Sequence, residues 1–257
     1  MMYRRLFIGV FFFVSTLLQA ETIRLTNGEW PPYLSEHYKH QGVVSRIVRE
    51  AFEISEIDVE YGFFPWARAF KNAKLGNEWL GSVVWAITPE RRDDFVFSDA
   101  VFGDKTVFFH LAINDVRWTS LKDLSQYQIG ATRSYAYGEE FHRLEKEGVL
   151  NVKWATHDVN NFRKLLAGRI DLFPVQEFVG IEILKTNFSE SEFNKIRYTQ
   201  SFRETPYFLM LNKNAPESER YIRLFNQGLS ALKASGKLQK YLSDNAKGLY
   251  RPPLIEE

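Results

Sequence analysis

The sequence predicts an α/β fold built from two halves. Short apolar strand-like segments alternate with amphipathic helix-like segments both before and after residue 115. This alternation is typical of α/β folds with mostly parallel sheets. Two longer extended runs, residues 105–114 and 206–212, flank the middle third of the chain. We expect these two runs to cross between the halves, so that each half forms a lobe.

The first half contains, in order, a strand, a helix, a strand, a helix and a strand. The first helix follows from apolar residues that recur at helical spacing between Val43 and Phe52. Pro65 suits the start of the second helix, because an N–H group would be unpaired there, and we expect Gly76 to end it. The predicted ranges are 23–26, 42–54, 59–63, 65–76 and 82–87.

The second half repeats the alternation, and a helix closes the chain. Gly148 is expected to stop the first of its helices. In open sheets of parallel strands, ligands bind beyond the carboxyl ends of the strands. The predicted strands are 127–130, 152–155 and 170–173, and the predicted helices are 135–147, 158–167, 174–185 and 217–242.

The first twenty residues have the pattern of a secretory signal peptide. Arg4 and Arg5 precede an apolar run over residues 6–18, and Ala20 offers a small residue for cleavage. The run is shorter than the ~20 residues that span a bilayer, although a retained signal anchor is the alternative. The chain has no cysteine, which excludes disulfides and the thiol needed for a lipid anchor. We therefore expect an unanchored periplasmic protein cleaved near Ala20, with full secretion as the alternative.

Charge and motifs point away from nucleic acid and from catalysis. Removing residues 1–20 takes away two arginines and no acid, so the formal net charge changes from +1 to −1. Such a balance does not favour a nucleic acid or an anionic membrane as a partner. The sequence contains no Gly-x-Ser-x-Gly elbow, phosphate loop, dinucleotide fingerprint or His-Glu-x-x-His. We expect no catalytic residue, no cofactor and no metal site.

Several short segments, taken together, resemble a known family. They are Asn27 to Tyr33, Ile87 to Arg91, Phe95 to Asp99, Leu121 to Leu124 and Gly168 to Leu172. In their order and spacing they resemble the bacterial extracellular solute-binding proteins of family 3, the periplasmic amino-acid-binding class. The resemblance implies a type II periplasmic-binding-protein fold, whose two α/β lobes close on a ligand by hinge motion. It places lobe 1 at residues 21–111 plus 203–257 and lobe 2 at residues 112–202, after a signal peptide over residues 1–20.

The resemblance also implies ligand-binding residues in the first lobe. Arg91 matches the family arginine that holds the ligand's α-carboxylate with its planar guanidinium fork. The alternative is a surface arginine paired with Asp93 or Asp94. Tyr33 matches an aromatic residue that covers the ligand and can attract an ammonium group, and its alternative is simple packing. The other positions that the resemblance brings to the cleft are Trp66, Trp85 and Ala86, with a core role as the alternative for Trp85.

In the second lobe the family pattern is altered. Ser134 and Tyr135 fall where the family has a glycine and hydroxyl residues at a helix N-terminus, whose N–H groups bind carboxylates. Gln176 stands where the family often has an aspartate that holds the α-ammonium group. A neutral amide cannot neutralise that charge, and burying an uncompensated charge is costly. We therefore expect a small carboxylate-bearing solute. A carboxylate that lacks the amine, or an aromatic or modified amino acid, is favoured over an ordinary α-amino acid.

The function that the resemblance implies is solute capture without catalysis. A periplasmic solute-binding protein would take up a small carboxylate-bearing ligand and deliver it to an ABC-type permease. The alternatives are a ligand-binding sensor for a membrane receptor and a dehydratase-like enzyme on the same fold. The expected partners are the small molecule and an inner-membrane permease or receptor, and the chain is expected to be a monomer.

Overall fold

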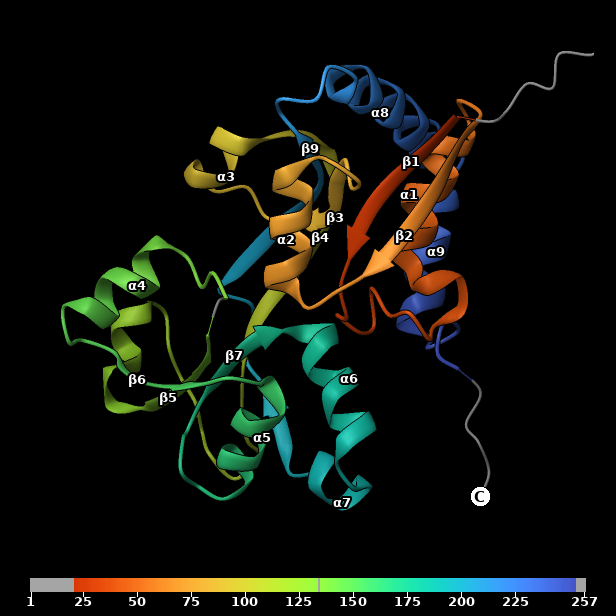
Figure 1. Cartoon of the computed structure of the whole chain (residues 1–257). Helices are drawn as coiled ribbons and strands as arrows, with labels where there is room; N and C mark the ends of the chain where they lie inside the picture. The colour runs from red at the N-terminus through yellow and green to blue at the C-terminus, as the bar shows by residue number, and fades with distance from the viewer. Residues whose placement is uncertain (1–20, 134, 253–257) are drawn as a thin grey trace, which may run out of the picture.

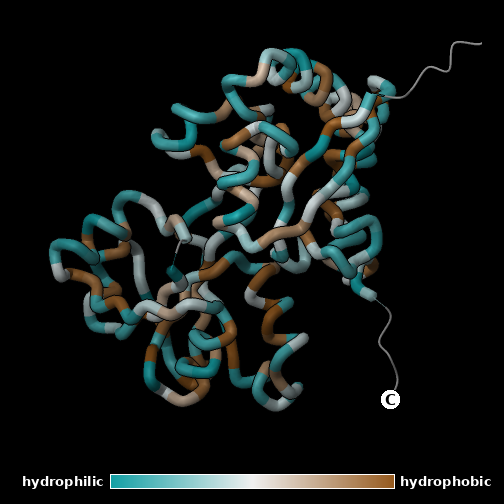
Figure 2. Tube along the Cα trace, viewed as in Figure 1, coloured by the Kyte–Doolittle hydropathy of each residue, from teal (hydrophilic) through white to brown (hydrophobic). Residues whose placement is uncertain are grey.

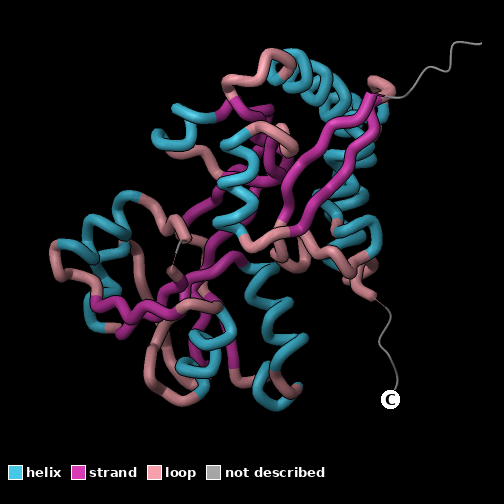
Figure 3. Tube along the Cα trace, in the orientation of Figure 1, coloured by secondary structure: helices cyan, strands magenta, loops and turns pink. Residues whose placement is uncertain are grey.

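The computed structural model describes residues 21–133 and 135–252 and has the expected α/β, two-lobed periplasmic-binding-protein fold (Figure 1). Strands run through the middle of the molecule, and the helices lie around them (Figure 3). The predicted signal peptide, residues 1–20, lies outside the described residues. Within those residues, no helix combines the length and apolar character needed to cross a membrane.

Most strands belong to one mixed sheet with the order β2-β1-β3-β9-β4-β7, and β8 pairs with β4. Strands β5 and β6 form a separate parallel pair. The prediction of mostly parallel sheets holds for β1, β2 and β3, but every pairing described for β4 and β9 is antiparallel. The strands are β1 (Glu21–Asn27), β2 (Ile57–Phe63), β3 (Gly81–Trp85), β4 (Phe95–Leu111), β5 (Gln128–Thr132), β6 (Asn151–Ala155), β7 (Phe173–Gln176), β8 (Ile196–Tyr198) and β9 (Arg203–Asn212).

Strands β4 and β9 are the two crossings that the sequence predicted. They pair with each other from Phe95 and Asn212 at one end to Thr106 and Arg203 at the other. Strand β3 continues the sheet beside β9, and β7 and β8 continue it beside the far end of β4. Both crossings are longer than predicted, because the ladder extends back into the first half of the molecule. The lobe boundaries at residues 111–112 and 202–203 stay a prediction.

Helices cover the sheet on both sides. In Figure 1, α1, α8 and α9 lie together on one side of β1 and β2, and α2 lies on the other. The predicted helix over 217–242 is two helices, because Gly236 has φ 74° and ends α8. The helices are α1 (Val43–Glu53), α2 (Trp66–Leu75), α3 (Pro89–Asp94), α4 (Glu139–Lys146), α5 (Asp158–Leu166), α6 (Glu177–Asn187), α7 (Glu190–Phe193), α8 (Ser218–Ala234) and α9 (Lys237–Ala246).

Two predicted elements begin later than the sequence indicated. Helix α4 starts at Glu139, four residues after the predicted start, because Gly138 takes φ 101° and the chain before it is a loop. Strand β7 starts at Phe173 rather than at residue 170. Leu172 makes only an isolated bridge to Ile129, so the chain contacts β5 before it joins β4. Local apolar pattern gave the right elements but not these boundaries.

Buried apolar side chains form two main clusters. The larger one packs α1 and α8 against the sheet and follows β4 and β9 to α5, with Phe52, Phe109 and Phe225 among its largest members. The smaller one surrounds Phe141 and Leu144 of α4 beside β5. Figure 2 shows hydrophobic residues along the central strands and on one side of the helices. Burial of these apolar surfaces drives folding and fixes the strands that carry the site.

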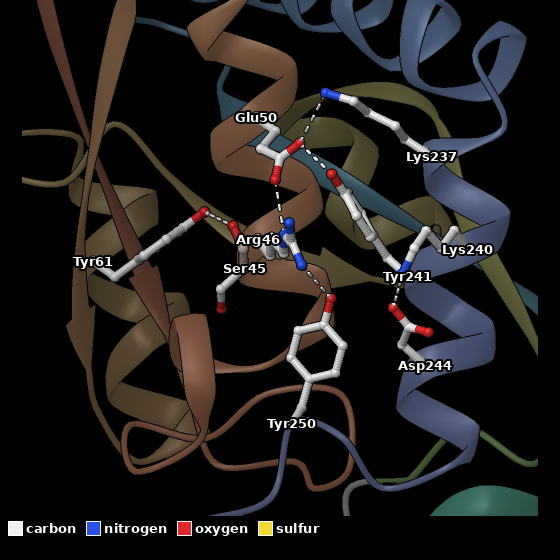
Figure 4. Close-up of polar contacts among 9 residues, drawn as sticks. All are labelled: Ser45, Arg46, Glu50, Tyr61, Lys237, Lys240, Tyr241, Asp244 and Tyr250. Atoms are coloured by element: carbon white, nitrogen blue, oxygen red, sulfur yellow. Dashed lines mark hydrogen bonds and ion pairs between the residues drawn. The ribbon is translucent and has the colours of Figure 1, made fainter.

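A polar network joins α1 to α9 and to the chain that follows it (Figure 4). Arg46 donates to Glu50 at 2.8 Å and to the Tyr250 hydroxyl at 3.2 Å, and its guanidinium lies 3.8 Å from the centre of the Tyr241 ring. Tyr241 in turn donates to Glu50 at 2.6 Å. These contacts are partly exposed, so they add orientation to a helix pair that apolar burial already holds.

A close approach between α1 and α8 supplies a stability test. A Cβ atom on Gly228 of α8 would lie 1.9 Å from the carbonyl oxygen of Ala51 in α1. Helix propensity alone predicts that alanine gains about 1 kcal/mol here. We expect Gly228→Ala instead to destabilise the protein by at least about 2 kcal/mol, because backbone cannot move aside cheaply. Urea unfolding measures the change, and Gln227→Ala on the exposed face should stay within about 0.5 kcal/mol of the parent.

Candidate functional site

An aromatic cluster lies where the loop after β1 meets the two crossing strands. Trp30 and Tyr33 come from the loop, Phe102 from β4 and Tyr207 from β9. The Phe102 and Tyr207 rings stack with centroids 5.3 Å apart, Tyr33 lies 4.7 Å from Phe102, and Trp30 lies 4.9 Å from Tyr207. Tyr33 is 4% exposed, so its side chain is packed. It also lies at the junction of the loop and the crossing strands, so packing and a place at the site occur together. The cluster gives the middle of the molecule an apolar wall with two hydroxyl groups.

Asp104 of β4 is a buried carboxyl group beside this cluster. It is 3% exposed, and one of its oxygens accepts from the Lys105 backbone N–H at 2.8 Å. The other oxygen, Oδ2, has no hydrogen-bond partner among the described residues. Burial raises the pKa of Asp104 to about 7, against the influence of the nearby Tyr33 hydroxyl, and the charges of Glu177 and Glu204 act in the same direction as burial. A carboxyl group in this position is suited to receive a cationic group.

Gln176 ends β7, the strand that pairs with β4, and reaches the same Tyr207 hydroxyl. Its amide nitrogen donates to the Tyr207 hydroxyl at 3.1 Å, while its buried amide oxygen has no partner among the described residues. Burial raises the pKa of Tyr207, and the charge of Asp104 raises it further. Two buried acceptor atoms on the adjacent strands β4 and β7, one on Asp104 and one on Gln176, therefore have no described partner.

Arg91 lies in α3, just before β4, and has no acidic partner among the described residues. One guanidinium nitrogen donates to the Ala86 carbonyl at 2.6 Å, and the guanidinium carbon lies 4.7 Å from the centre of the Trp85 ring. No ion pair within 21–133 and 135–252 involves Arg91, and Asp94 pairs with Lys74 at 2.6 Å instead. Partial burial lowers the pKa of Arg91. The structure thus does not support the surface pairing with Asp93 or Asp94 that we considered as the alternative.

Trp66 packs edge-to-face against Trp85, the ring beside Arg91, with ring centroids 5.3 Å apart. The Trp66 indole N–H donates to the Glu29 carbonyl at 3.1 Å, and the Trp85 indole N–H donates to Ser82 at 2.8 Å. Val84, just before Trp85, has φ 63°, an unfavourable conformation for a β-branched residue. The strand register shifts between Ser82 and Trp85, so this irregular end of β3 brings the Trp85 ring and the Ala86 carbonyl against Arg91.

The loop before α4 comes close to the same region. Tyr135 donates to Asp158 at 2.7 Å, and Thr132 donates to the other oxygen of Asp158 at 2.5 Å. Arg203 of β9 donates to the Ala136 carbonyl at 2.8 Å and so ties this loop to a crossing strand. Because α4 begins only at Glu139, residues 135 and 136 do not form the helix N-terminus that the sequence predicted as an anion site. Ser134 lies outside the described residues.

The structure brings most of the predicted residues to one region and adds others. The charges of Asp104, Arg203 and Arg91 all influence the Tyr207 hydroxyl, and the nearby Tyr207 raises the pKa of Tyr135. The sequence reasoning missed Asp104 and Tyr207. If the extended run predicted over residues 105–114 had been started a few residues earlier, Phe102 and Asp104 would have fallen on one face of it, because side chains alternate along a strand. Among the described residues, no group of three or more acidic or histidine side chains could hold a metal ion.

Comparison with known proteins agrees with this architecture. No protein-family model and no curated protein matches the sequence. Among solved structures, a histidine kinase sensor domain similar to periplasmic binding proteins has a TM-score of 0.69 at 18% identity, covering 87% of this chain and 95% of that one. The substrate-binding protein of an amino acid ABC transporter has a TM-score of 0.66 at 16% identity, covering 88% and 99%. The GluR0 ligand-binding core from Nostoc punctiforme, bound to L-glutamate, has a TM-score of 0.66 at 18% identity, covering 86% and 98%. At these identities the likeness shows the fold.

The buried carboxyl group makes the stability of the ligand-free protein depend on pH. The pKa of Asp104 rises from 3.8 to about 7 in the fold, so the folded state binds a proton that the unfolded chain releases between these values. This stabilising contribution is complete below pH ~4 and is lost as the pH rises through about 7. We expect Asp104→Asn to remove that loss and to be more stable than the parent at pH 8, by up to about 4 kcal/mol. Urea unfolding from pH 4 to 8 measures it. Asp99→Asn, at an exposed position, should follow the parent curve.

Proposed function

We propose that this protein captures a small carboxylate-bearing solute between its two lobes, with residues 21–111 plus 203–257 as lobe 1 and 112–202 as lobe 2. The observation that carries the proposal is Arg91, a half-buried guanidinium with no acidic partner among the described residues. Its hold on the Ala86 carbonyl and on the Trp85 ring fixes its position and leaves donor groups for a ligand. A carboxylate fits these donors in geometry and charge.

Asp104 favours an amino acid over a simple carboxylate. Gln176 is neutral, so it cannot balance an ammonium group, but Asp104 lies on the adjacent strand and acts on the same Tyr207 hydroxyl. A ligand ammonium beside Asp104 Oδ2 would pair an oxygen that has no described partner and would favour the ionised carboxylate. The rings of Tyr33 and Tyr207 would add a favourable aromatic surface for a cation. A ligand with one carboxylate and one ammonium group satisfies both ends of the site.

For the biological role we propose delivery of the solute to an ABC-type permease from the periplasm. The amino acid ABC transporter component among the structural neighbours supports this role. The histidine kinase sensor domain, an equally similar fold, supports the alternative that the closed form signals to a membrane receptor. Co-purification with detergent-solubilised membrane proteins, with and without ligand, separates the two by the identity of the protein captured.

A dehydratase-like enzyme is the competing function that Asp104 itself favours. A carboxyl group with a pKa of about 7 is suited to general acid–base catalysis near neutral pH. We propose binding, because the neighbouring structures are binding and sensor domains. Proton NMR of each bound ligand, before and after prolonged incubation with the protein, distinguishes the functions. Conversion of the ligand would show an enzyme.

The first binding prediction concerns Arg91. We expect a thermal-shift screen of amino acids, 2-oxo acids and small carboxylates to raise the melting temperature for at least one of them. Arg91→Gln should weaken that ligand by about tenfold to a hundredfold, since it removes a charge-assisted hydrogen bond. Arg92→Gln, at the exposed neighbour, should bind like the parent in calorimetry. Parental affinity in Arg91→Gln would show that the carboxylate lies elsewhere.

The second binding prediction concerns the ammonium group. We expect the parent to bind an amino acid more tightly than the matching 2-oxo acid, and Asp104→Asn to lose that preference by about tenfold or more. The 2-oxo acid should bind Asp104→Asn no more weakly than the parent, because it offers no cation to Asp104. Calorimetry with both ligands and both proteins gives the interaction free energy between the ligand's ammonium group and Asp104 directly. An unchanged preference in the variant would exclude contact between Asp104 and the ligand's ammonium group.

A further inference from the structure

A second charged site lies outside the region around Tyr207. Between β6 and α5 the structure has a hollow of about 560 Å³. Four cationic residues line it: Arg133 after β5, Arg163 and Lys164 of α5, and Arg169 in the turn after α5. The remaining lining residues are neutral, and Thr156 and Asn160 among them carry polar side chains.

These four cations are not neutralised by the described parts of the chain. None of them takes part in an ion pair within residues 21–133 and 135–252, and Arg163 makes only a 3.5 Å contact to Asn160. The nearest acid on α5, Asp158, is used by Thr132 and Tyr135, and burial raises its pKa. Asp171, after Arg169, accepts from the Gln128 backbone N–H at 2.8 Å. Like charges gathered in a concave surface create a positive potential that attracts anions.

We propose that this hollow is a second binding site, for a small polyanion that carries two or more phosphoryl or carboxylate groups. The volume of the hollow is in the range of small-molecule sites. A compact ligand therefore fits the hollow better than the flat surface of a macromolecule does. Three arginine side chains from different segments offer several planar forks, which suits oxyanions with more than one charged group. The site is independent of the proposed solute site, which depends on Arg91 and Asp104.

The test is calorimetric titration with inorganic phosphate, pyrophosphate, tripolyphosphate and citrate. We expect saturable one-to-one binding that strengthens with the number of phosphoryl groups and weakens as salt rises from about 20 mM to about 500 mM, because partly exposed charges are screened. Tighter binding of citrate than of tripolyphosphate would assign the site to polycarboxylates, and the reverse order to phosphoryl compounds. Absence of saturable binding by all of them at low salt overturns the proposal.

Two variant pairs decide where the polyanion binds. Arg163→Gln with Arg169→Gln should weaken the tightest probe by at least about tenfold, since two charge-assisted contacts are lost. The matched control, Lys122→Gln with Arg223→Gln, removes the same charge from exposed positions elsewhere and should bind like the parent. Equal weakening in both pairs would show a general charge effect and would overturn the proposal. Arg91→Gln should leave polyanion binding unchanged, so this result stands or fails separately from solute capture. Unchanged melting temperatures confirm that the variants are folded.

Discussion

The structure depends on one continuous ladder, the antiparallel pairing of β4 with β9 from Phe95 and Asn212 to Thr106 and Arg203. Each lobe attaches its own strands to this pair, β3 on one side and β7 with β8 on the other. The ladder therefore does more than connect the lobes. Its buried face carries Phe102, Asp104 and Tyr207, so the strands that hold the lobes together also form the floor of the proposed site. A change in their register would move the hinge and the site at once.

The proposed site is best understood as two charges that the protein leaves without partners. Arg91 has no described acid, and Asp104 Oδ2 has no described donor. Both act on the Tyr207 hydroxyl, with opposite effects on its pKa. Leaving a buried polar or charged group unpaired costs free energy. Without a ligand, the protein lowers this cost by holding Asp104 in its neutral, protonated form. A zwitterionic ligand would pair both groups, so the free energy that these unpaired groups cost would be regained on binding.

Much of the architecture could be predicted from the sequence, because apolar periodicity reports which face of each segment is buried. The segments predicted as 42–54 and 65–76 became α1 and α2, and the two extended runs became β4 and β9. The site was harder to predict. Arg91 could be identified because it lies in a recognisable segment, but Asp104 lies in a strand that crosses the molecule, and its burial depends on Tyr33 and on β9. The anion site predicted at Ser134 and Tyr135 required a helix start, and the conformation of Gly138 moves that start to Glu139. Tertiary contacts and single glycine dihedrals decide such details, and local pattern does not contain them.

The two charged regions differ in how lobe movement would affect them. The proposed solute site combines Arg91 of α3 with Asp104 of β4 and Gln176 of β7, which the two proposed lobes supply, so hinge motion would change the distance between Arg91 and Gln176. The hollow between β6 and α5 is built from Arg133, Arg163 and Arg169, all within one stretch of the proposed second lobe. Hinge motion would carry that hollow as a rigid unit and leave its charges in place. A polyanion there would affect solute capture only if it bound one of the two lobe arrangements better than the other, so any coupling between the sites has to arise from contacts beyond the hollow itself.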